Sequence, residues 1–383
     1  AHEQMGFQIF LRRKLRISTI MIIFGEKNLI PKNSMAYYKK IKYMQDTEMR
    51  QRTLERLLSL REQLGNEIPK RTANDTLLLA TWNIREFGEG RLEESYYYIA
   101  EIIDHFDLVV VQEVNSNQMG GLEKVISILG SEWSYIVSDG VDGVAGGGEA
   151  MAFIYNTNKV KFTNMAGEIV LPENKAIDGL QFARTPFMAS FRAGWFDFKL
   201  CTVHIYYGSK KNELGQYERR LKEIQTISSF LLKRQKKEDV SYIILGDFNI
   251  PKTNSEYFNA LSSKSGFYVP EEIMEHPTDL GQVSHYDQIG FKLKLDHDMA
   301  VWAKGKQKAG AFNFTKSVFK HSDQESDFLV YRKYYEKEGQ TEADLKKAFK
   351  QWRTFQVSDH MPLWVELQVN FSDQYLNRKL GES

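Results

Sequence analysis

From Leu77 onward, short apolar runs alternate with segments whose apolar residues recur at helical spacing. The apolar runs are rich in leucine, isoleucine and valine, which is typical of buried β-strands. Helical spacing is found in residues 92–105, 121–129, 213–237 and 342–352, and in residues 38–64 ahead of the first run. This alternation predicts an α+β domain in which helices cover β-sheets.

Six short polar clusters stand at the ends of these apolar runs. They occupy residues 79–88, 109–113, 149–153, 201–204, 243–249 with 286–287, and 358–360. An isolated Asp or Asn after a strand is usually a turn former. The run Gly246-Asp247-Phe248-Asn249 is more specific, because its polar side chains directly follow a segment that must be buried. The joint presence of all six clusters favours a catalytic site.

The residue types in these clusters suit the hydrolysis of a phosphoester. That reaction needs a hard cation on the phosphate oxygens and a base for the attacking water. The carboxylates of Glu113, Asp247 and Asp359 and the amide oxygens of Asn83 and Asn249 are ligands of the kind that magnesium prefers. We therefore expect Mg²⁺ as the cofactor, with Mn²⁺ or Ca²⁺ as alternatives. Zinc is not expected, because the chain has one cysteine and no HExxH motif.

Two histidines are the candidates for acid–base chemistry, His204 and His360. Histidine has an unperturbed pKa near neutrality, so it can both accept and donate a proton. A carboxylate on the far side of each ring would fix its tautomer and favour its protonated form. Glu149 and Asp287 are available for that purpose.

The clusters together resemble the endonuclease/exonuclease/phosphatase superfamily. The run Asn83-Ile-Arg-Glu-Phe-Gly88 is most similar to the deoxyribonuclease I branch. Further segments similar to that branch are Val111-Gln-Glu-Val114, Glu149 opening a strand, Arg184-Thr-Pro-Phe187, Val203-His204 and Tyr286-Asp-Gln-Ile289. The resemblance covers roughly residues 77 to 370. It implies a four-layer α/β/β/α sandwich of two mostly antiparallel sheets, with the site at one edge.

The resemblance also implies roles for individual residues. A single magnesium would lie near Glu113, with Asn83 and Asp359 completing its ligands. His204 with Glu149 would form one acid–base unit, and His360 with Asp287 the other.

Three more residues receive roles from the same resemblance. Asp247 and Asn249 would act at the phosphate, together with Asn83. Arg184 would match a family arginine near the phosphate. It can equally be read as a surface arginine ahead of a strand.

Two departures from the deoxyribonuclease branch concern the substrate. That branch carries an arginine and a tyrosine that reach into the DNA minor groove, and here Asn115 and the glycines at 146–148 stand in those places. Tyr206 and Tyr207 are possible replacements. We expect a nucleic acid, with DNA first, as the substrate partner.

The net charge of the chain is compatible with functions other than DNA cleavage. The 51 basic and 50 acidic residues give a formal net charge of +1, which argues against strong nonspecific binding of polyanions. A phosphatase or phosphodiesterase acting on a small molecule or a lipid headgroup is therefore the alternative to an endonuclease. A catalytically silent binding module is a third possibility, disfavoured because no expected catalytic residue has been lost.

The domain organisation predicted from the sequence has four parts. We expect an N-terminal extension without fixed structure at 1–37, a helix within 38–70, the catalytic domain at 71–372 and a tail at 373–383. The domain would carry an insertion at about 296–357. The insertion mixes aromatic residues with Lys304, Lys306 and Lys308, so it is either a flap that contacts substrate or an ordinary packed insertion.

The single cysteine, Cys201, cannot form an intramolecular disulfide, whereas secreted deoxyribonucleases of the similar branch carry one. A cytoplasmic or otherwise intracellular location is therefore expected. The apolar stretch 17–24 follows several basic residues but is far shorter than the roughly 20 residues that span a bilayer. We expect no stable membrane insertion.

Overall fold

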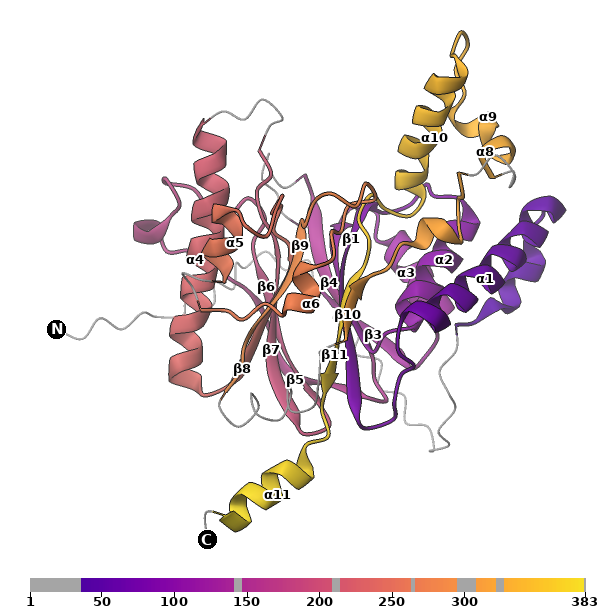
Figure 1. Ribbon diagram of the computed structural model, residues 1–383. Coiled ribbons are helices and arrows are strands. Elements are labelled where there is room, and N and C mark those ends of the chain that lie inside the picture. The colour runs from indigo at the N-terminus through magenta and orange to yellow at the C-terminus, as the bar shows by residue number, and fades with distance from the viewer. Residues whose placement is uncertain are drawn as a thin grey trace. The chain divides into compact units, whose positions relative to one another are not determined.

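Two β-sheets form the centre of the protein in the computed structural model, which describes residues 36–140, 147–208, 214–262, 266–294, 308–321 and 327–381 (Figure 1). The first sheet has the strand order β10-β11-β1-β2-β4-β3, and the second has the order β5-β6-β7-β8-β9. Strands of the first sheet are β1 (Thr76–Phe87), β2 (Leu108–Asn115), β3 (Trp133–Val137), β4 (Glu149–Asn156), β10 (Ala309–Ala311) and β11 (Leu363–Gln368). Those of the second are β5 (Val160–Glu168), β6 (Phe187–Ala193), β7 (Phe196–His204), β8 (Ser241–Asp247) and β9 (Asp287–Lys292).

Each sheet contains one parallel pair among otherwise antiparallel neighbours. In the first sheet β1 and β2 run parallel, and in the second sheet β7 and β8 do. All other pairings in the two sheets are antiparallel. The prediction of two mostly antiparallel sheets is confirmed.

Alternation along the strands builds two separate apolar cores. Leu77 and Leu79 of β1 point into the core between the sheets, whereas Leu78, Ala80 and Trp82 point to the helices on the outer face of the first sheet. Successive strand residues face opposite sides, so a strand that is buried on both faces needs a continuous apolar run. The run that opens β1 meets this need, and the polar Asn83 ends it.

Helices cover the outer face of each sheet (Figure 1). Helices packed on the first sheet are α1 (Thr47–Glu67), α2 (Glu93–Asp104), α3 (Gly120–Leu129) and α10 (Glu342–Gln356). Helices packed on the second sheet are α4 (Leu214–Glu238) and α5 (Glu256–Leu261). The remaining described helices are the 3-10 helices η1 (Tyr38–Tyr43), η2 (Glu173–Lys175) and η3 (Phe314–Lys316), with α6 (Glu271–Met274), α8 (Asp327–Val330), α9 (Arg332–Tyr335) and α11 (Ser372–Gly381). The four-layer arrangement predicted from the sequence is therefore confirmed.

The N-terminal helical segment differs in detail from its prediction. Residues 38–64 form η1 and α1, and the two are separated because Asp46 caps α1 by accepting a hydrogen bond from the Met49 backbone amide. The helix also continues to Glu67. Its buried face consists of Thr53, Leu57, Leu60 and Leu64, whereas Leu54 and Leu58 are exposed.

The insertion contributes to the core of the first sheet. Its aromatic residues Phe312, Phe314 and Phe319 are buried among the outer helices, so packing rather than substrate contact explains them. Strand β10 extends the sheet by pairing with β11. Lys304 and Lys306 lie outside the described residues, and so do residues 1–35 of the predicted extension.

The tail predicted at 373–383 is largely helical, because α11 spans Ser372–Gly381. Among the described helices, none is long and apolar enough to cross a membrane.

Candidate active site

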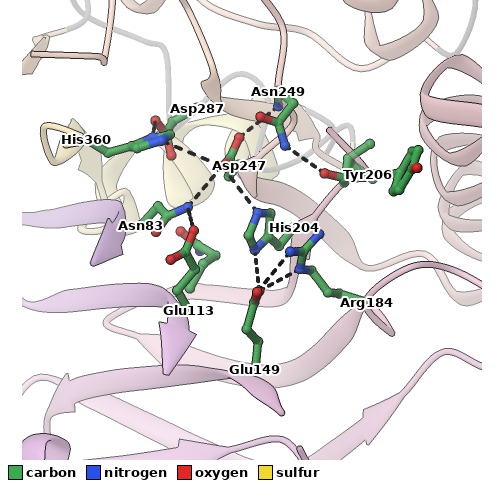
Figure 2. A network of polar contacts seen from close by, with 12 residues as sticks. Asn83, Glu113, Glu149, Arg184, His204, Tyr206, Asp247, Asn249, Asp287 and His360 are labelled. Atoms are coloured by element: carbon green, nitrogen blue, oxygen red, sulfur yellow. Dashed lines mark hydrogen bonds and ion pairs between the residues drawn. The ribbon is translucent and has the colours of Figure 1, made fainter. Parts of the chain in front are cut away.

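The predicted site residues meet where the parallel strands of both sheets approach their carboxyl ends. In the first sheet, Asn83 of β1 pairs in register with Gln112 of β2, the residue before Glu113. In the second sheet, His204 of β7 stands opposite Asp247 of β8. Because parallel strands end at the same edge of a sheet and the two sheets face each other, these side chains converge at the boundary between the sheets (Figure 2).

Strand register adds Asp287 to this group. The antiparallel β8–β9 ladder sets Asp247 opposite Asp287, so three site residues form one row across β7, β8 and β9. His204 Nε2 lies 3.5 Å from Asp247 Oδ2, and His360 Nε2 lies 3.9 Å from the same oxygen. Asp247 is therefore flanked by the two histidines (Figure 2).

His360 and Asp287 form a buried ion pair. His360 Nδ1 is 2.7 Å from Asp287 Oδ2, and the Asp287 side chain is 0% exposed. Burial alone would lower the pKa of His360, but the carboxylates of Asp287 and Asp247 overcome it and raise that pKa well above its ordinary value. Burial also raises the pKa of Asp287, so the pair holds one proton between them. We place that proton on His360 because two carboxylates face its ring.

Ser358 fixes the loop that carries His360. Its hydroxyl donates to the backbone carbonyl of Asn83 at 2.6 Å and accepts from the backbone amides of His360 at 3.0 Å and Arg85 at 3.2 Å. The indole of Trp82 donates to the His360 carbonyl at 2.9 Å. The loop before β11 is thus held to the end of β1, which sets the position of the imidazole.

His204 and Glu149 form a second and more open pair. His204 Nδ1 lies 3.1 Å from Glu149 Oε2, and the Glu149 side chain is 26% exposed. Arg184 contacts the same carboxylate with both ends of its guanidinium, at 2.5 and 2.9 Å. Burial opposes the charge on Glu149, but the contacts with His204 and Arg184 hold its pKa at about 2. Arg184 is therefore part of the site and not a surface arginine.

Asn83 links the two sheets. Its side-chain amide donates to Glu113 Oε1 at 2.9 Å and to Asp247 Oδ2 at 3.0 Å. Two carboxylates on one side require the NH₂ group to face them, so Oδ1 points the other way. Within the described part of the chain this buried oxygen has no hydrogen-bond partner. A buried amide oxygen without a hydrogen-bond partner is a ligand that a hard divalent cation could use.

The other predicted metal ligand, Asp359, contacts a cation of the protein. Its Oδ2 accepts a hydrogen bond from Arg85 Nη1 at 3.2 Å. A second group could also hold a metal ion, because ligand atoms of Asp247, Asp287 and His360 lie within 4.8 Å of one another. The close His360–Asp287 contact favours a proton, rather than a metal ion, between these two side chains. The roles of Asp359 and of the other proposed ligands stay predictions.

The backbone at the site adopts unusual conformations. Glu113 has φ +60° and Asn249 has φ +53°, in the left-handed region that residues other than glycine rarely occupy. Such strain is often found at functional sites, where the surrounding structure maintains it. Gly246 has φ +133°, and a Cβ atom there would lie 2.1 Å from the carbonyl oxygen of Val203. Only glycine therefore allows β8 to approach β7 just before Asp247.

Sequence reasoning missed three residues that organise this site. Ser358 lies in the predicted polar cluster at 358–360, but the pattern indicates no task for its side chain. Arg220 and Glu223 of α4 contact the backbone of several site loops, including those after β7 and β8. A charged pair at 219–220 and a Glu at 223 beside the apolar Ile224 are ordinary in an amphipathic helix, so only the buried position of Glu223 distinguishes it.

A model of the "Endonuclease/Exonuclease/phosphatase family" matches residues 80–297, and the chain belongs to that family. Members of that family are hydrolases that act on phosphoester bonds.

Similar proteins include deoxyribonuclease-1 of two mammals. The Canis lupus familiaris protein is 26% identical over 186 residues, covering 45% of this chain and 60% of the relative. The Bos taurus protein is 25% identical over 187 residues, covering 45% and 61%. The match thus spans about three fifths of the length of these relatives. A solved endonuclease/exonuclease/phosphatase family protein from Bacteroides thetaiotaomicron has a TM-score of 0.50 at 19% identity, with 78% of this chain and 99% of that chain covered, which shows the shared fold.

Proposed function

We propose that this chain is a magnesium-dependent endonuclease that hydrolyses phosphodiester bonds in DNA. The observation that carries the proposal is that Asp247 lies between two separate histidine–carboxylate pairs. In-line attack of water on phosphorus needs a base for the water and an acid for the leaving oxygen, and two separately oriented histidines can supply both. The similarity to deoxyribonuclease-1 supports DNA as the substrate.

The different settings of the two histidines support different tasks. His360, which faces the carboxylates of Asp287 and Asp247, is protonated and gives its proton to the leaving oxygen. His204 Nδ1 lies 3.1 Å from Glu149 and its Nε2 lies 3.5 Å from Asp247, and in the reaction Nε2 accepts a proton from the attacking water. The water oxygen forms the new bond to phosphorus as the bond to the leaving oxygen breaks.

Asp247 and Asn249 keep this arrangement in place. Asp247 Oδ1 accepts a hydrogen bond from the Asn249 backbone amide at 2.8 Å, while its Oδ2 faces Asn83 and the histidines. The Asn249 side chain donates to the Ile205 carbonyl at 2.7 Å, which ties the loop after β8 to the loop after β7. Asp247 thereby orients both the water and the imidazole that deprotonates it.

The oxygens of Glu113 and Asn83 would hold the cation, and Asp359 would complete the set. A divalent cation bound there supplies positive charge to the phosphate oxygens. Arg184 adds a second positive charge on the other side of the site, near Glu149. The phosphate would thus be approached by cations from both sheets.

Two observations favour a small phosphoester as the alternative substrate. Asn115, at the position where the similar branch has a groove-reading arginine, uses its side-chain oxygen to accept a hydrogen bond from the Asn117 backbone amide at 3.0 Å, which is a local turn contact. The formal net charge of +1 provides little general attraction for DNA. A phosphatase or phosphodiesterase of the same family would need neither feature.

The proposal is tested by incubating the purified protein with supercoiled plasmid DNA, with and without magnesium. A panel of phosphomonoesters and lipid phosphodiesters is tested in parallel. Asp247→Ala removes the carboxylate between the histidines, and Asp197→Asn, on the exposed part of β7 beside Arg192, is the matched control.

We expect magnesium-dependent nicking that Asp197→Asn retains and Asp247→Ala loses. Intact plasmid together with hydrolysis of a small ester would overturn the endonuclease proposal and establish the alternative. Nicking that persists in Asp247→Ala would show that a contaminating nuclease is responsible.

A further inference from the structure

A fully buried carboxylate on α4 contacts two loops of the site. Glu223 is 0% exposed, yet it accepts hydrogen bonds from the backbone amides of Ala183 and Tyr206, both at 3.0 Å. Its neighbour one turn earlier, Arg219, donates to it at 3.2 Å. Burying a carboxylate is costly unless strong hydrogen bonds compensate, and here the two loop amides and Arg219 provide them.

The two amides that Glu223 holds belong to the loops that carry the partners of Glu149. Ala183 directly precedes Arg184, and Tyr206 lies two residues after His204. Arg184 comes from the loop ahead of β6, and His204 from the end of β7. One carboxylate on α4 therefore holds the segment before Arg184 and the segment after His204 at a fixed distance from each other.

Arg220, on the same helix, holds a third loop. Its guanidinium donates to the backbone carbonyls of Tyr206 at 3.1 Å and Asn249 at 3.0 Å, and also to that of Tyr207. The guanidinium carbon lies 4.9 Å from the ring centre of Tyr207 and 4.9 Å from that of Tyr257. Because Asn249 has a left-handed backbone conformation, a fixed partner for its carbonyl helps to maintain it.

Core packing alone does not explain these two residues. The apolar contacts of α4 with the second sheet are made by Ile224, Ile227 and Leu231. An apolar residue at 223 would leave the amides of Ala183 and Tyr206 without an acceptor. Glu223 and Arg220 instead make hydrogen bonds to the backbone of loops that lie next to site residues.

We propose that Glu223 and Arg220 are positioning residues of the reaction, which set the placement of His204, Arg184 and Asn249 from the helix layer without touching the substrate. The proposal rests on the function proposed above. In that reaction the proton transfer depends on the placement of His204 Nε2, so a shift of the loop after β7 changes the rate of the chemical step more than it changes substrate binding.

The test replaces the hydrogen-bonding groups while keeping their size. In Glu223→Gln, the side-chain NH₂ group must face one of the two loop amides, so one donor loses its acceptor. Arg220→Lys keeps the charge but cannot reach three carbonyls with one ammonium group. Glu218→Gln, on the exposed side of the same helix, is the matched control.

The first measurement is steady-state hydrolysis of plasmid DNA and of bis(4-nitrophenyl) phosphate. We expect Glu223→Gln and Arg220→Lys each to lower kcat by about ten- to a hundredfold, with KM changed by less than about threefold, and Glu218→Gln to leave both unchanged. In a His204→Ala background, Glu223→Gln should lower kcat by a smaller factor than in the wild type, because the main residue through which it acts is gone. An equal loss in both backgrounds would mean a general structural effect and would overturn the proposal, as would an unchanged kcat.

The second measurement does not depend on activity. In ¹H–¹⁵N spectra of the imidazole groups, assigned with His204→Ala and His360→Ala, Glu223→Gln should move the resonances of His204 and leave those of His360 in place. Unmoved His204 resonances would overturn the positioning proposal even in an active enzyme. If the wild-type protein hydrolyses no ester while His204 still moves in Glu223→Gln, the proposed function fails and the positioning contact stands.

Discussion

The two histidine–carboxylate pairs differ in how they are enclosed. The His360–Asp287 pair is buried, and its carboxylate makes a short contact with one ring nitrogen. The His204–Glu149 pair is partly open, and its carboxylate is shared with Arg184. In the first pair the histidine pKa is raised, whereas in the second the glutamate pKa is lowered to about 2. Similar residue types therefore have different effects on the two sides of Asp247. The His360 pair holds a proton, and the Glu149 pair holds a negative charge.

Both pairs nevertheless share one architectural property, because each joins the two sheets. Glu149 comes from β4 of the first sheet and meets His204 of β7 in the second. His360 precedes β11 of the first sheet and meets Asp287 of β9 in the second. The site is thus a product of sheet packing, and its geometry depends on the apolar core between the sheets.

Removing each imidazole should have the largest effect. His360→Ala and His204→Ala should each lower turnover by about a hundredfold or more, the usual contribution of a positioned acid or base. We expect the greater loss for His360→Ala, because it removes both a proton and a buried positive charge between two carboxylates. Turnover of plasmid DNA, or of the ester identified as substrate, is the measurement. Near-normal turnover in His360→Ala would refute the assignment.

Neutralising the carboxylate of each pair should lower the stability of the protein by different amounts. Asp287→Asn leaves the buried His360 without its closest partner, and breaking a buried ion pair typically costs about 3–5 kcal/mol. Glu149→Gln neutralises a carboxylate that is 26% exposed and leaves the Arg184 contact possible through the remaining amide oxygen, so its cost in stability should be smaller. Urea unfolding at neutral pH measures both. Asp287→Asn should also lower the pKa of His360, detectable by NMR titration; equal stability losses in the two variants would contradict the difference in enclosure.

Much of this arrangement follows from local sequence pattern. The continuous apolar run through Leu77, Leu78 and Leu79 predicts a buried strand, and the helical spacing of 213–237 predicts α4 nearly to its ends. The polar residues that end the strands identify the site edge because side chains there must leave the core. These features depend on residues that are neighbours in the chain, so the sequence pattern is enough to predict them.

Other features depend on contacts between distant segments. The β8–β9 register sets the enclosed position of Asp287, and Arg184 reaches the more open Glu149 from a separate segment. No local pattern encodes either contact. The same holds for Ser358, whose hydroxyl joins residues about 275 positions apart in the chain. The aromatic residues of the insertion are a further case, because Phe314 packs against Trp82 of β1 and the neighbouring Asn313 carbonyl accepts from Gln63 of α1, both remote in sequence.

The metal position offers a further test of the comparison. If the cation lies at Glu113, Glu113→Gln should raise the magnesium concentration needed for half-maximal activity by about tenfold or more, the usual effect of losing a group that supports a metal site. Asp287→Asn should lower turnover without that change. A magnesium titration of residual activity in both variants decides the matter. An unchanged magnesium requirement in Glu113→Gln, with a raised one in Asp287→Asn, would move the metal to the Asp247, Asp287 and His360 group.

The smallest expected effect concerns the open pair. The pKa of Glu149 is about 2 in the folded protein against an ordinary value of 4.5, so its contribution to stability is complete above pH 4.5 and is lost as the pH falls toward 2. Arg184→Met removes one of the two partners that lower this pKa. The variant should therefore be less stable than the wild type at neutral pH, and the difference should disappear toward pH 2.

Arg192→Met is the matched control, because Arg192 pairs with Asp197 on the exposed surface and that contact should contribute little. The free energy of unfolding in urea at several pH values, with an NMR titration of the Glu149 carboxyl carbon, measures both variants. The Glu149 pKa should rise toward its ordinary value in Arg184→Met and stay low in Arg192→Met. If Glu149 titrates at the same pH with and without Arg184, His204 alone holds its charge, and the open pair resembles the buried one in having a single partner.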